Sequence, residues 1–235
     1  MNLRNSIKKE YFETLVSTNE YAKARRGEKQ NLWIVAKSQT GGKGTKGRSF
    51  SSKKGGLYLT ALIFHENFPA ANAFKVMQGA AAAVCETLAY FGVSPKIKWP
   101  NDIYVNGKKI CGILIENVFS GAFVSSSVVG VGLNVQNRLE EELLPIATTL
   151  EKETGEKFAV ERVEEKLFSF LFQENVEEKY FSYLGWLGEK ATLIMGEEKR
   201  EVTLVSVDEQ GGLLVETKDG KLRVSAGEVS LKIQS

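Results

Sequence analysis

A hairpin signature in the middle of the chain constrains the fold more than any other feature. The pair Asn106-Gly107 separates two strand-like runs, 103–105 and 108–116. Asn-Gly is the favoured pair for a two-residue turn, because both central residues must adopt positive φ. The two runs are therefore expected to lie side by side as antiparallel strands, so this part of the chain must belong to a β-sheet.

Further strands and helices are expected around this hairpin. Apolar, β-rich runs predict strands at 11–16, 32–36, 57–64, 97–99 and 123–135. Ser17 and Glu20 form a capping-box pattern that starts a helix reaching Arg25. Helical patterns also cover 72–91, 140–150 and 160–187. Together these segments predict a mixed α/β (α+β) domain.

The last part of the chain has a different pattern. Short strands are expected at 191–195, 201–207, 213–217, 221–225 and 228–233, separated by Gly-containing turns. We expect these strands to form a small β-barrel that is appended to the first domain. The predicted domains are therefore 1–187 and 188–235.

Composition argues against several classes of protein. No stretch approaches the ~18 consecutive apolar residues of a membrane span, and the polar N-terminus lacks the apolar region of a signal peptide. Cys85 and Cys111 form neither a disulfide framework nor a zinc-ligand spacing. We interpret them as buried thiols in a reducing compartment, so a cytoplasmic location is expected. With His65 as the one histidine, a dedicated metal site is not expected.

Basic residues are concentrated in one glycine-rich segment. Between residues 37 and 54 there are six lysines and arginines, four glycines and no acidic residue. Glycines let backbone N–H groups approach a phosphate, and interleaved cations neutralise its charge. The segment lacks the Gly-Lys-Ser/Thr ending of a Walker loop. It indicates a small anionic ligand better than general nucleic-acid binding, and a flexible surface loop with solvated lysines is an equal alternative.

Two further segments carry residues of chemical interest. The run Lys98-Trp-Pro-Asn-Asp102 places an amide, a carboxylate and an aromatic ring at the end of a strand, where loops build sites. It could equally be a turn that bonds its own backbone, with Lys98 as an edge-strand gatekeeper or as a cation at a pocket rim. In 129–135, two glycines inside a strand mark a close approach, and by itself this run favours a structural role.

Taken together, these segments resemble the biotin–protein ligases. The resemblance begins near residue 11 and consists of Ser17-Thr-Asn19, the basic loop 42–48, the run 98–102 followed by Lys109, and the run 130–134. The closing run 227–231 also resembles the end of the family's C-terminal domain. Lipoate ligases share the fold but lack the Lys-Trp-Pro-Asn-Asp run. The resemblance implies a class II synthetase-like catalytic domain with an SH3-like β-barrel.

The resemblance implies a two-step reaction. The carboxylate of biotin attacks the α-phosphate of ATP, which gives biotinyl-5′-adenylate and pyrophosphate. A lysine of a biotin carboxyl carrier protein then attacks this mixed anhydride. Such chemistry needs positioning and cations more than covalent help from the protein. Magnesium is expected to accompany ATP, held mainly by phosphates and water. The resemblance also implies a homodimer, and a membrane partner is not expected.

The family's biotin site maps onto specific positions of this chain. The resemblance implies that Ser17, Thr18 and Asn19 line the ureido site, and that Gln39 contacts biotin before the basic loop. Lys43, Gly44 and Thr45 match the loop residues over the biotin carboxylate and the adenylate phosphate. Lys109 matches the lysine that binds the carboxylate and the adenylate, and it is the expected electrostatic catalyst.

The nucleotide site is implied in the same way. Lys46 and Arg48 are candidates, with Lys43, for binding the phosphates of ATP. Asn101 and Asp102 are expected near the reacting phosphate and the incoming amine, so Asp102 and Arg48 join Lys109 as candidate catalytic residues. Asn134 is expected to help to hold adenine, and no residue is assigned to a metal.

The basic loop departs from the family pattern at two positions. The family usually has arginine where this chain has Lys43 and Thr45. Lys43 keeps the charge without the bidentate fork of arginine, and Thr45 loses the charge. We therefore predict weaker retention of biotinyl-adenylate unless Lys46 substitutes for the missing cation.

The N-terminal region is a second departure. Some family members begin with a winged-helix DNA-binding domain, whereas the first family motif of this chain is already at Ser17. The expected protein is therefore a monofunctional ligase without a DNA partner. Two competing hypotheses are a lipoate or octanoyl transferase, against which the Trp-Pro-Asn-Asp run argues, and a biotin sensor without transferase activity, which only Thr45 favours.

Overall fold

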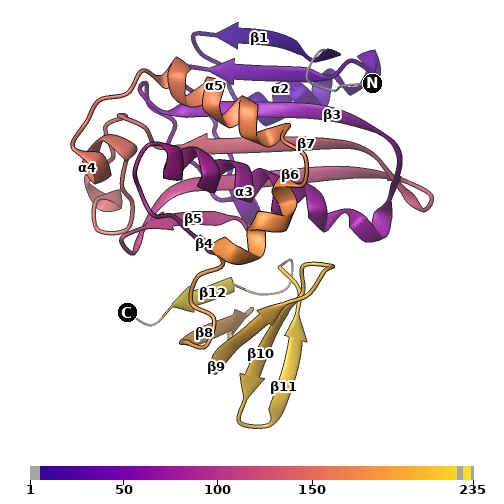
Figure 1. The fold of residues 1–235 in the computed structure, drawn as a ribbon, viewed down its shortest axis with the longest axis vertical. Helices are drawn as coiled ribbons and strands as arrows, with labels where there is room; N and C mark the ends of the chain where they lie inside the picture. The colour runs from indigo at the N-terminus through magenta and orange to yellow at the C-terminus, as the bar shows by residue number, and fades with distance from the viewer. Residues whose placement is uncertain (1–5, 227–229, 234–235) are drawn as a thin grey trace.

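The structure is a computed structural model that describes residues 6–226 and 230–233. It contains a large mixed sheet and a separate small antiparallel sheet below it in the view of Figure 1. The strands of the large sheet are β1 (Lys8–Phe12), β2 (Leu32–Ala36), β3 (Leu57–Pro69), β4 (Lys96–Lys98), β5 (Asp102–Val105), β6 (Lys108–Ser120) and β7 (Phe123–Leu133). The expected mixed α/β fold with an appended β unit is confirmed.

The large sheet has the strand order β1-β2-β3-β7-β6-β5-β4. β1 and β2 pair in parallel, and the other neighbours pair antiparallel. The predicted hairpin is confirmed between β5 and β6, where Asn106 and Gly107 have φ of 49° and 76°. This hairpin places Asp102 opposite Gly112, on the strand next to the edge strand β4.

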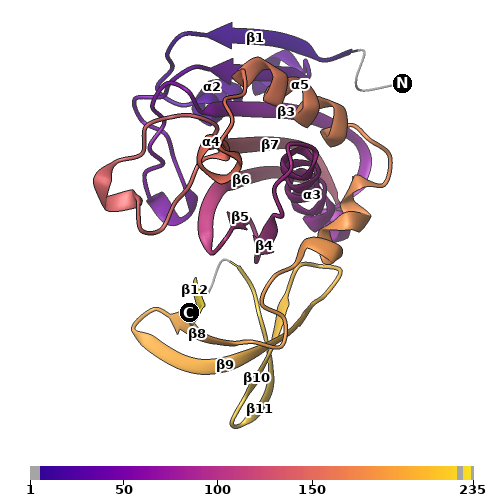
Figure 2. The same ribbon diagram turned by 60° about the vertical axis from the view of Figure 1, so that its left-hand side comes forward.

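Helices cover both faces of the large sheet (Figure 2). α3 and α5 pack on one face with core residues such as Trp33, Leu59 and Val131. α2 contacts β3 and β7 on the other face, beside a core cluster that includes Ile34 and Leu62. Successive strand residues point to opposite faces, so β2 is buried on both. The helices are α2 (Thr18–Ala24), α3 (Phe74–Tyr90), α4 (Leu150–Thr154) and α5 (Val160–Leu171), with 3-10 helices η1 (Arg26–Glu28), η2 (Thr45–Gly47), η3 (Ala70–Asn72), η4 (Glu141–Leu143) and η5 (Val176–Tyr183).

Two predicted strands run further than expected, as β3 to Pro69 and β6 to Ser120, and three predicted elements are shorter or displaced. The helix expected at 140–150 is only the short η4, because Pro145 within it supplies no N–H to a helical hydrogen bond. The helix expected at 160–187 is broken after Leu171, and Asn175 adopts a left-handed conformation before η5 begins. The strand expected at 11–16 begins and ends earlier as β1, and Leu15 forms only an isolated bridge with Gln39.

The small sheet lies at the C-terminal end of the chain. Its strands are β8 (Lys190–Met195), β9 (Glu198–Val207), β10 (Leu213–Thr217), β11 (Gly220–Val224) and β12 (Ser230–Ile233). They pair antiparallel in the order β11-β10-β9-β8-β12, and within the described residues this sheet is not closed into a barrel. Residues 227–229 of the family-like closing run lie outside the described residues. The proposed domain boundary at 187/188 falls between η5 and β8.

The two sheets meet around one aromatic residue of the large domain. Trp99 is buried with the apolar residues of the small sheet, among them Leu193, Val207 and Leu213. Its indole Nε1 donates a hydrogen bond of 3.0 Å to the carbonyl of Gly211. The residue that begins the Trp-Pro-Asn-Asp run is therefore part of the inter-sheet core. Within residues 6–226 and 230–233, no helix combines the length and apolarity needed to cross a bilayer.

Candidate functional site

A cavity opens on the face of the large sheet that α2 also covers. Its floor uses small residues of β6 and β7, with Gly112 paired to Gly132 and Gly130 paired to Thr60 of β3. Glycines here leave room for another group to approach the sheet closely. The lining residues are Ser17, Thr18, Asn19, Gln39, Lys43, Gly44, Thr45, Arg48, Ser49, Phe50, Leu59, Asn101, Asp102, Lys109, Gly112, Ile113, Leu114, Gly130, Val131 and Gly132.

The start of α2 places three polar side chains at this cavity. Ser17 is the N-cap residue, and its hydroxyl accepts a hydrogen bond of 3.4 Å from the backbone N–H of Glu20, as the capping-box pattern predicts. The next residue, Thr18, donates from its backbone N–H and its hydroxyl to Gln39 Oε1, at 2.8 and 3.1 Å. Gln39 in turn donates to the Ser52 hydroxyl. These contacts join α2 to the start of the basic segment.

Asn19 is the most informative polar residue of this group. Its Oδ1 lies 2.6 Å from the hydroxyl of Thr60, which also lies 2.8 Å from the Thr18 hydroxyl. Its amide Nδ2 is buried and has no hydrogen-bond partner among the described residues. A buried donor without a partner is destabilising, and because Asn19 lines the cavity, its amide can donate to an acceptor on a ligand there.

Two glycines of β7 make room for side chains of the site. A Cβ on Gly130 would lie 2.1 Å from Asn19 Oδ1, and a Cβ on Gly132 would lie 2.6 Å from the ring of Phe50. Taken alone, this run was expected to have a structural role, and neither Phe50 nor Thr60 was predicted for the site. A buried polar residue within the apolar run 57–64 was the available signal for Thr60, and the position of Phe50 directly after the basic loop was the signal for Phe50.

The basic loop carries its charges at the rim of the cavity. Lys43 is exposed and its Nζ lies 2.8 Å from Glu20 Oε1, which also pairs with Lys23 at 2.6 Å. These two lysines, with Lys23 contributing more, hold the pKa of Glu20 below its ordinary value. Arg48 donates to the Thr45 hydroxyl at 3.0 Å and to the Thr45 carbonyl at 3.3 Å. The side chain of Lys46 lies outside the described residues.

The β5–β6 hairpin supplies the charged pair on the other side. Lys109 Nζ lies 2.6 Å from Asp102 Oδ1, and the two side chains are 30% and 21% exposed. Both charged groups are therefore partly shielded from bulk water, and both remain accessible to a ligand. Asn101 is buried, and its Nδ2 donates to the carbonyl of Ile113 at 2.7 Å. This hydrogen bond fixes the residue before Asp102 to the neighbouring strand.

The sequence left two roles open for Lys98, an edge-strand gatekeeper and a cation at a pocket rim. Lys98 lies on β4, an edge strand of the large sheet, and it lines a second cavity that shares Thr45, Arg48, Asn101 and Asp102 with the first. Burial lowers the pKa of its ammonium group, and the nearby carboxylate of Asp102 opposes this change. Lys98 is thus both an edge-strand residue and a cation at the cavity.

Asn134 is the predicted site residue that the structure places elsewhere. It is buried at the end of β7, and its Oδ1 accepts a hydrogen bond of 3.1 Å from Asn137. It is not among the described residues that line the first cavity. The structure does bring together at that cavity Ser17, Thr18, Asn19, Gln39, Lys43, Gly44, Thr45, Arg48, Asn101, Asp102 and Lys109.

The arrangement suits a ligand with a neutral polar part and an anionic part. Amide and hydroxyl groups of α2 and Gln39 can bind the former, and Lys109, Arg48 and Lys98 can bind the latter. Among the described residues that line the two cavities there is neither cysteine nor histidine. The amides and cations that are present can orient a ligand and stabilise negative charge.

Comparisons with known sequences identify relatives over the whole fold. The sequence pattern described as Biotin/lipoate A/B protein ligase family matches residues 11–134, and that of the Biotin protein ligase C terminal domain matches residues 187–232. The Bifunctional ligase/repressor BirA of Bacillus subtilis is 30% identical over 237 residues, which cover 94% of this chain and 73% of the relative. The protein of the same name from Escherichia coli is 29% identical and is covered to 71%.

A solved structure is also similar across its full length. The biotin protein ligase from Aquifex aeolicus, in complex with biotin and ATP, superimposes with a TM-score of 0.77 and 31% sequence identity. The match covers 97% of this chain and 99% of that chain. It therefore includes both sheets and the cavity between α2, the basic loop and the β5–β6 hairpin.

Proposed function

Because the chain belongs to the biotin/lipoate A/B protein ligase family, we propose that it activates biotin with ATP and transfers it to a lysine of a biotin carboxyl carrier protein. The observation that carries this proposal is one cavity with an unpartnered amide donor on Asn19 and a lysine–carboxylate pair at Lys109 and Asp102. The neutral ureido ring of biotin suits the first group, and its carboxylate suits the second.

Biotin binding uses the polar residues of α2 and the basic segment. The ureido carbonyl accepts a hydrogen bond from Asn19 Nδ2, with Ser17, Thr18 and Gln39 around it. The ring of Phe50, which lies over Gly132, provides an apolar wall for the rest of the molecule. Lys109 binds the carboxylate, which would otherwise be repelled by Asp102.

The nucleotide binds beside the carboxylate of biotin. Lys43, Gly44, Thr45, Lys46 and Arg48 form the loop over its phosphates, and Asn101 lies next to the reacting centre. Asn134, which lies outside the first cavity, helps to hold adenine. Only one carboxylate, that of Asp102, lines the two cavities among the described residues, so magnesium enters with ATP and is held by phosphates and water.

The chemistry needs no covalent enzyme intermediate. In the first step a carboxylate oxygen of biotin bonds to the α-phosphorus and pyrophosphate leaves, while Lys109 and Arg48 stabilise the added negative charge. In the second step the neutral amine of the carrier lysine bonds to the acyl carbon and AMP leaves. Asp102 is the carboxylate placed to accept the proton that the amine loses.

Transfer of labelled biotin tests this proposal. The protein is incubated with magnesium, ATP, labelled biotin or lipoate, and a carrier domain, with a carrier whose acceptor lysine is replaced by arginine as control. Covalent label on the intact carrier from biotin alone supports the proposal. Label from lipoate instead would identify a lipoate ligase, and biotin binding without transfer would identify a biotin sensor.

The remaining properties implied by the family are part of the same proposal. The reaction takes place in the cytoplasm, where ATP and a carrier subunit of a biotin-dependent carboxylase are available. The protein acts as a homodimer without DNA, and sedimentation of the purified chain measures the assembly state.

A further inference from the structure

The segment from Ile97 to Asp102 is attached to four different parts of the molecule. The carbonyl of Ile97 accepts a hydrogen bond of 3.0 Å from Gly185, in the connection that leads to the small sheet. The indole of Trp99 donates to Gly211 in the turn between β9 and β10, and Asn101 exchanges two hydrogen bonds with Ile113 of β6. These anchors act on Ile97, Trp99 and Asn101, within the five residues before Asp102.

Tyr180 of η5 supplies the anchor at Pro100. Its side chain is fully buried, and its hydroxyl donates a hydrogen bond of 3.1 Å to the Pro100 carbonyl. Burial raises the pKa of this hydroxyl, so the group keeps its proton and stays a donor. Proline has no backbone N–H of its own, which makes its carbonyl the only backbone hydrogen-bonding group through which Pro100 can be held.

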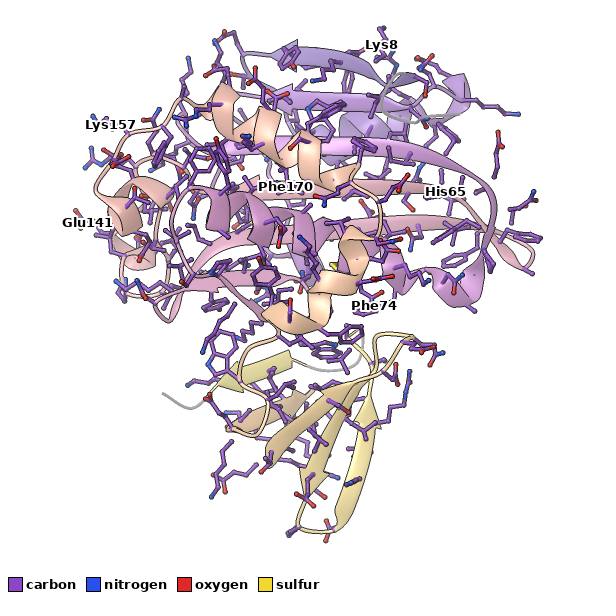
Figure 3. All side chains as sticks on the ribbon, viewed as in Figure 1. Lys8, His65, Phe74, Glu141, Lys157 and Phe170 are labelled. Carbon is purple, nitrogen blue, oxygen red and sulfur yellow. The ribbon has the colours of Figure 1, made fainter. Side chains whose placement is uncertain are left out.

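Phe74 connects this anchor to the one from the small sheet. Its ring lies edge-on to Tyr180, with 5.5 Å between ring centroids, and a Cβ on Gly211 would lie 2.3 Å from the same ring. Figure 3 shows Phe74 where the large domain meets the small sheet. The hydroxyl of Tyr180 and the carbonyl of Gly211 are thus held by one packed cluster.

We propose that Tyr180 is a positioning residue for the ligase reaction, whose hydroxyl fixes the Pro100 carbonyl and so holds Asp102 within ion-pair distance of Lys109. This inference rests on the proposed function. Tyr180 is not among the described residues that line either cavity at the site, so it acts through Pro100 and Asn101. A displacement of about 1 Å at a reacting centre can lower a rate by about a hundredfold, so one backbone hydrogen bond two residues away is sufficient to matter.

A pair of tyrosine variants on the same helix tests the proposal. Tyr180→Phe removes the hydrogen bond to Pro100, and the matched control Tyr183→Phe removes one of 2.7 Å from η5 to Glu86, on α3. We expect Tyr180→Phe to lower kcat for biotin transfer at least about tenfold, with KM for biotin within about twofold. Tyr183→Phe should leave kcat and KM unchanged, and both variants should lower the melting temperature.

A second measurement does not depend on activity. The backbone amide resonances of Asp102 and Lys109 should shift in Tyr180→Phe and stay in place in Tyr183→Phe. Equal kcat in the two variants, or unmoved Asp102 and Lys109 resonances in Tyr180→Phe, would overturn the proposal. If the wild-type protein transfers no biotin, the proposed function fails, and the amide resonances still decide whether Tyr180 positions this segment.

Discussion

Lys109 and Asp102 are the residues on which the proposed chemistry depends most. Their side chains come from the two strands of one hairpin and approach to 2.6 Å. Both residues were predicted from the Lys-Trp-Pro-Asn-Asp run and the lysine that follows it, because these residues lie close together in the chain. Phe50 and Thr60 were missed, because the weak signals for them gain meaning only from contacts with α2 and β7, which lie far away in the sequence.

Replacing Lys109 should abolish most of the activation step. Lys109→Gln removes the cation that binds the carboxylate of biotin and leaves Asp102 without its partner. We expect kcat to fall by about 10²–10³-fold, as for loss of a preorganised charge-stabilising donor. The neighbouring Lys108→Gln is the control, because Lys108 donates to the carbonyl of Leu144 and does not line the cavity. Comparable losses in the two variants would contradict the assignment.

Gly130 tests the ureido side of the site. In Gly130→Ala the new Cβ would lie 2.1 Å from Asn19 Oδ1, so Asn19 must turn away from its bonded position. We expect the dissociation constant for biotin, measured by calorimetry, to rise about tenfold or more, which corresponds to roughly 1.4 kcal/mol. Gly27→Ala, where a Cβ meets nothing within 4 Å, should bind biotin like the wild type. Unchanged binding by Gly130→Ala would refute the placement of biotin.

Thr45 tests the departure of the basic loop from the family pattern. Thr45→Arg adds a cation over the adenylate phosphate, and a charge-assisted hydrogen bond of about 1.5 kcal/mol would slow adenylate release about tenfold. Because Thr45 also accepts a hydrogen bond from Arg48, Thr45→Ala serves as the control for loss of that contact. Equal release rates for Thr45→Arg and the wild type, measured by stopped flow, would end this hypothesis.

At the scale of elements, the sequence predicted those turns and helix starts that a few neighbouring residues determine. The Asn-Gly hairpin and the Ser17 cap are confirmed, because a turn and a helix start are set by a few neighbouring residues. The helix expected at 160–187 fails because η5 is held by tertiary contacts. Lys179 and Tyr183 of η5 bind the two carboxylate oxygens of Glu86 on α3, at 2.6 and 2.7 Å. No sequence pattern predicts this arrangement.

The same carboxylate gives an expected pH dependence of stability. Burial tends to raise the pKa of Glu86, but the hydrogen bonds from Lys179 and Tyr183 outweigh it and hold the pKa below its ordinary value of 4.5. A lowered folded-state pKa contributes stability above the unfolded value, and this contribution is lost as the pH falls through the folded value. In urea titrations between about pH 6 and pH 3, Glu86→Gln should lose less stability than the wild type.

The control for this titration is an exposed glutamate in the turn after β9. Glu209→Gln should follow the wild-type curve, since Glu209 is exposed and far from η5 in the sequence. A Glu86→Gln curve parallel to that of the wild type would show that the pair with Lys179 does not stabilise the fold.

At the scale of the whole molecule, Trp99 joins the small sheet to the strand end that carries Asp102, and Leu231 of β12 lines the second cavity. The change of pattern near residue 190 predicted a separate β unit, and the structure confirms that unit as a five-stranded sheet. The strand order of the large sheet and the contact between Trp99 and Gly211 could not be predicted, because both depend on pairing between distant segments. This contact brings the small sheet within three residues of Asp102.

If this cavity activates biotin with ATP, pyrophosphate exchange measures that step without any carrier protein. Labelled pyrophosphate is incubated with the enzyme, magnesium and ATP, with biotin, with lipoate or with neither. We expect label in ATP only when biotin is present, and little exchange in Lys109→Gln. No exchange by a protein that binds biotin, or equal exchange with lipoate, would contradict it.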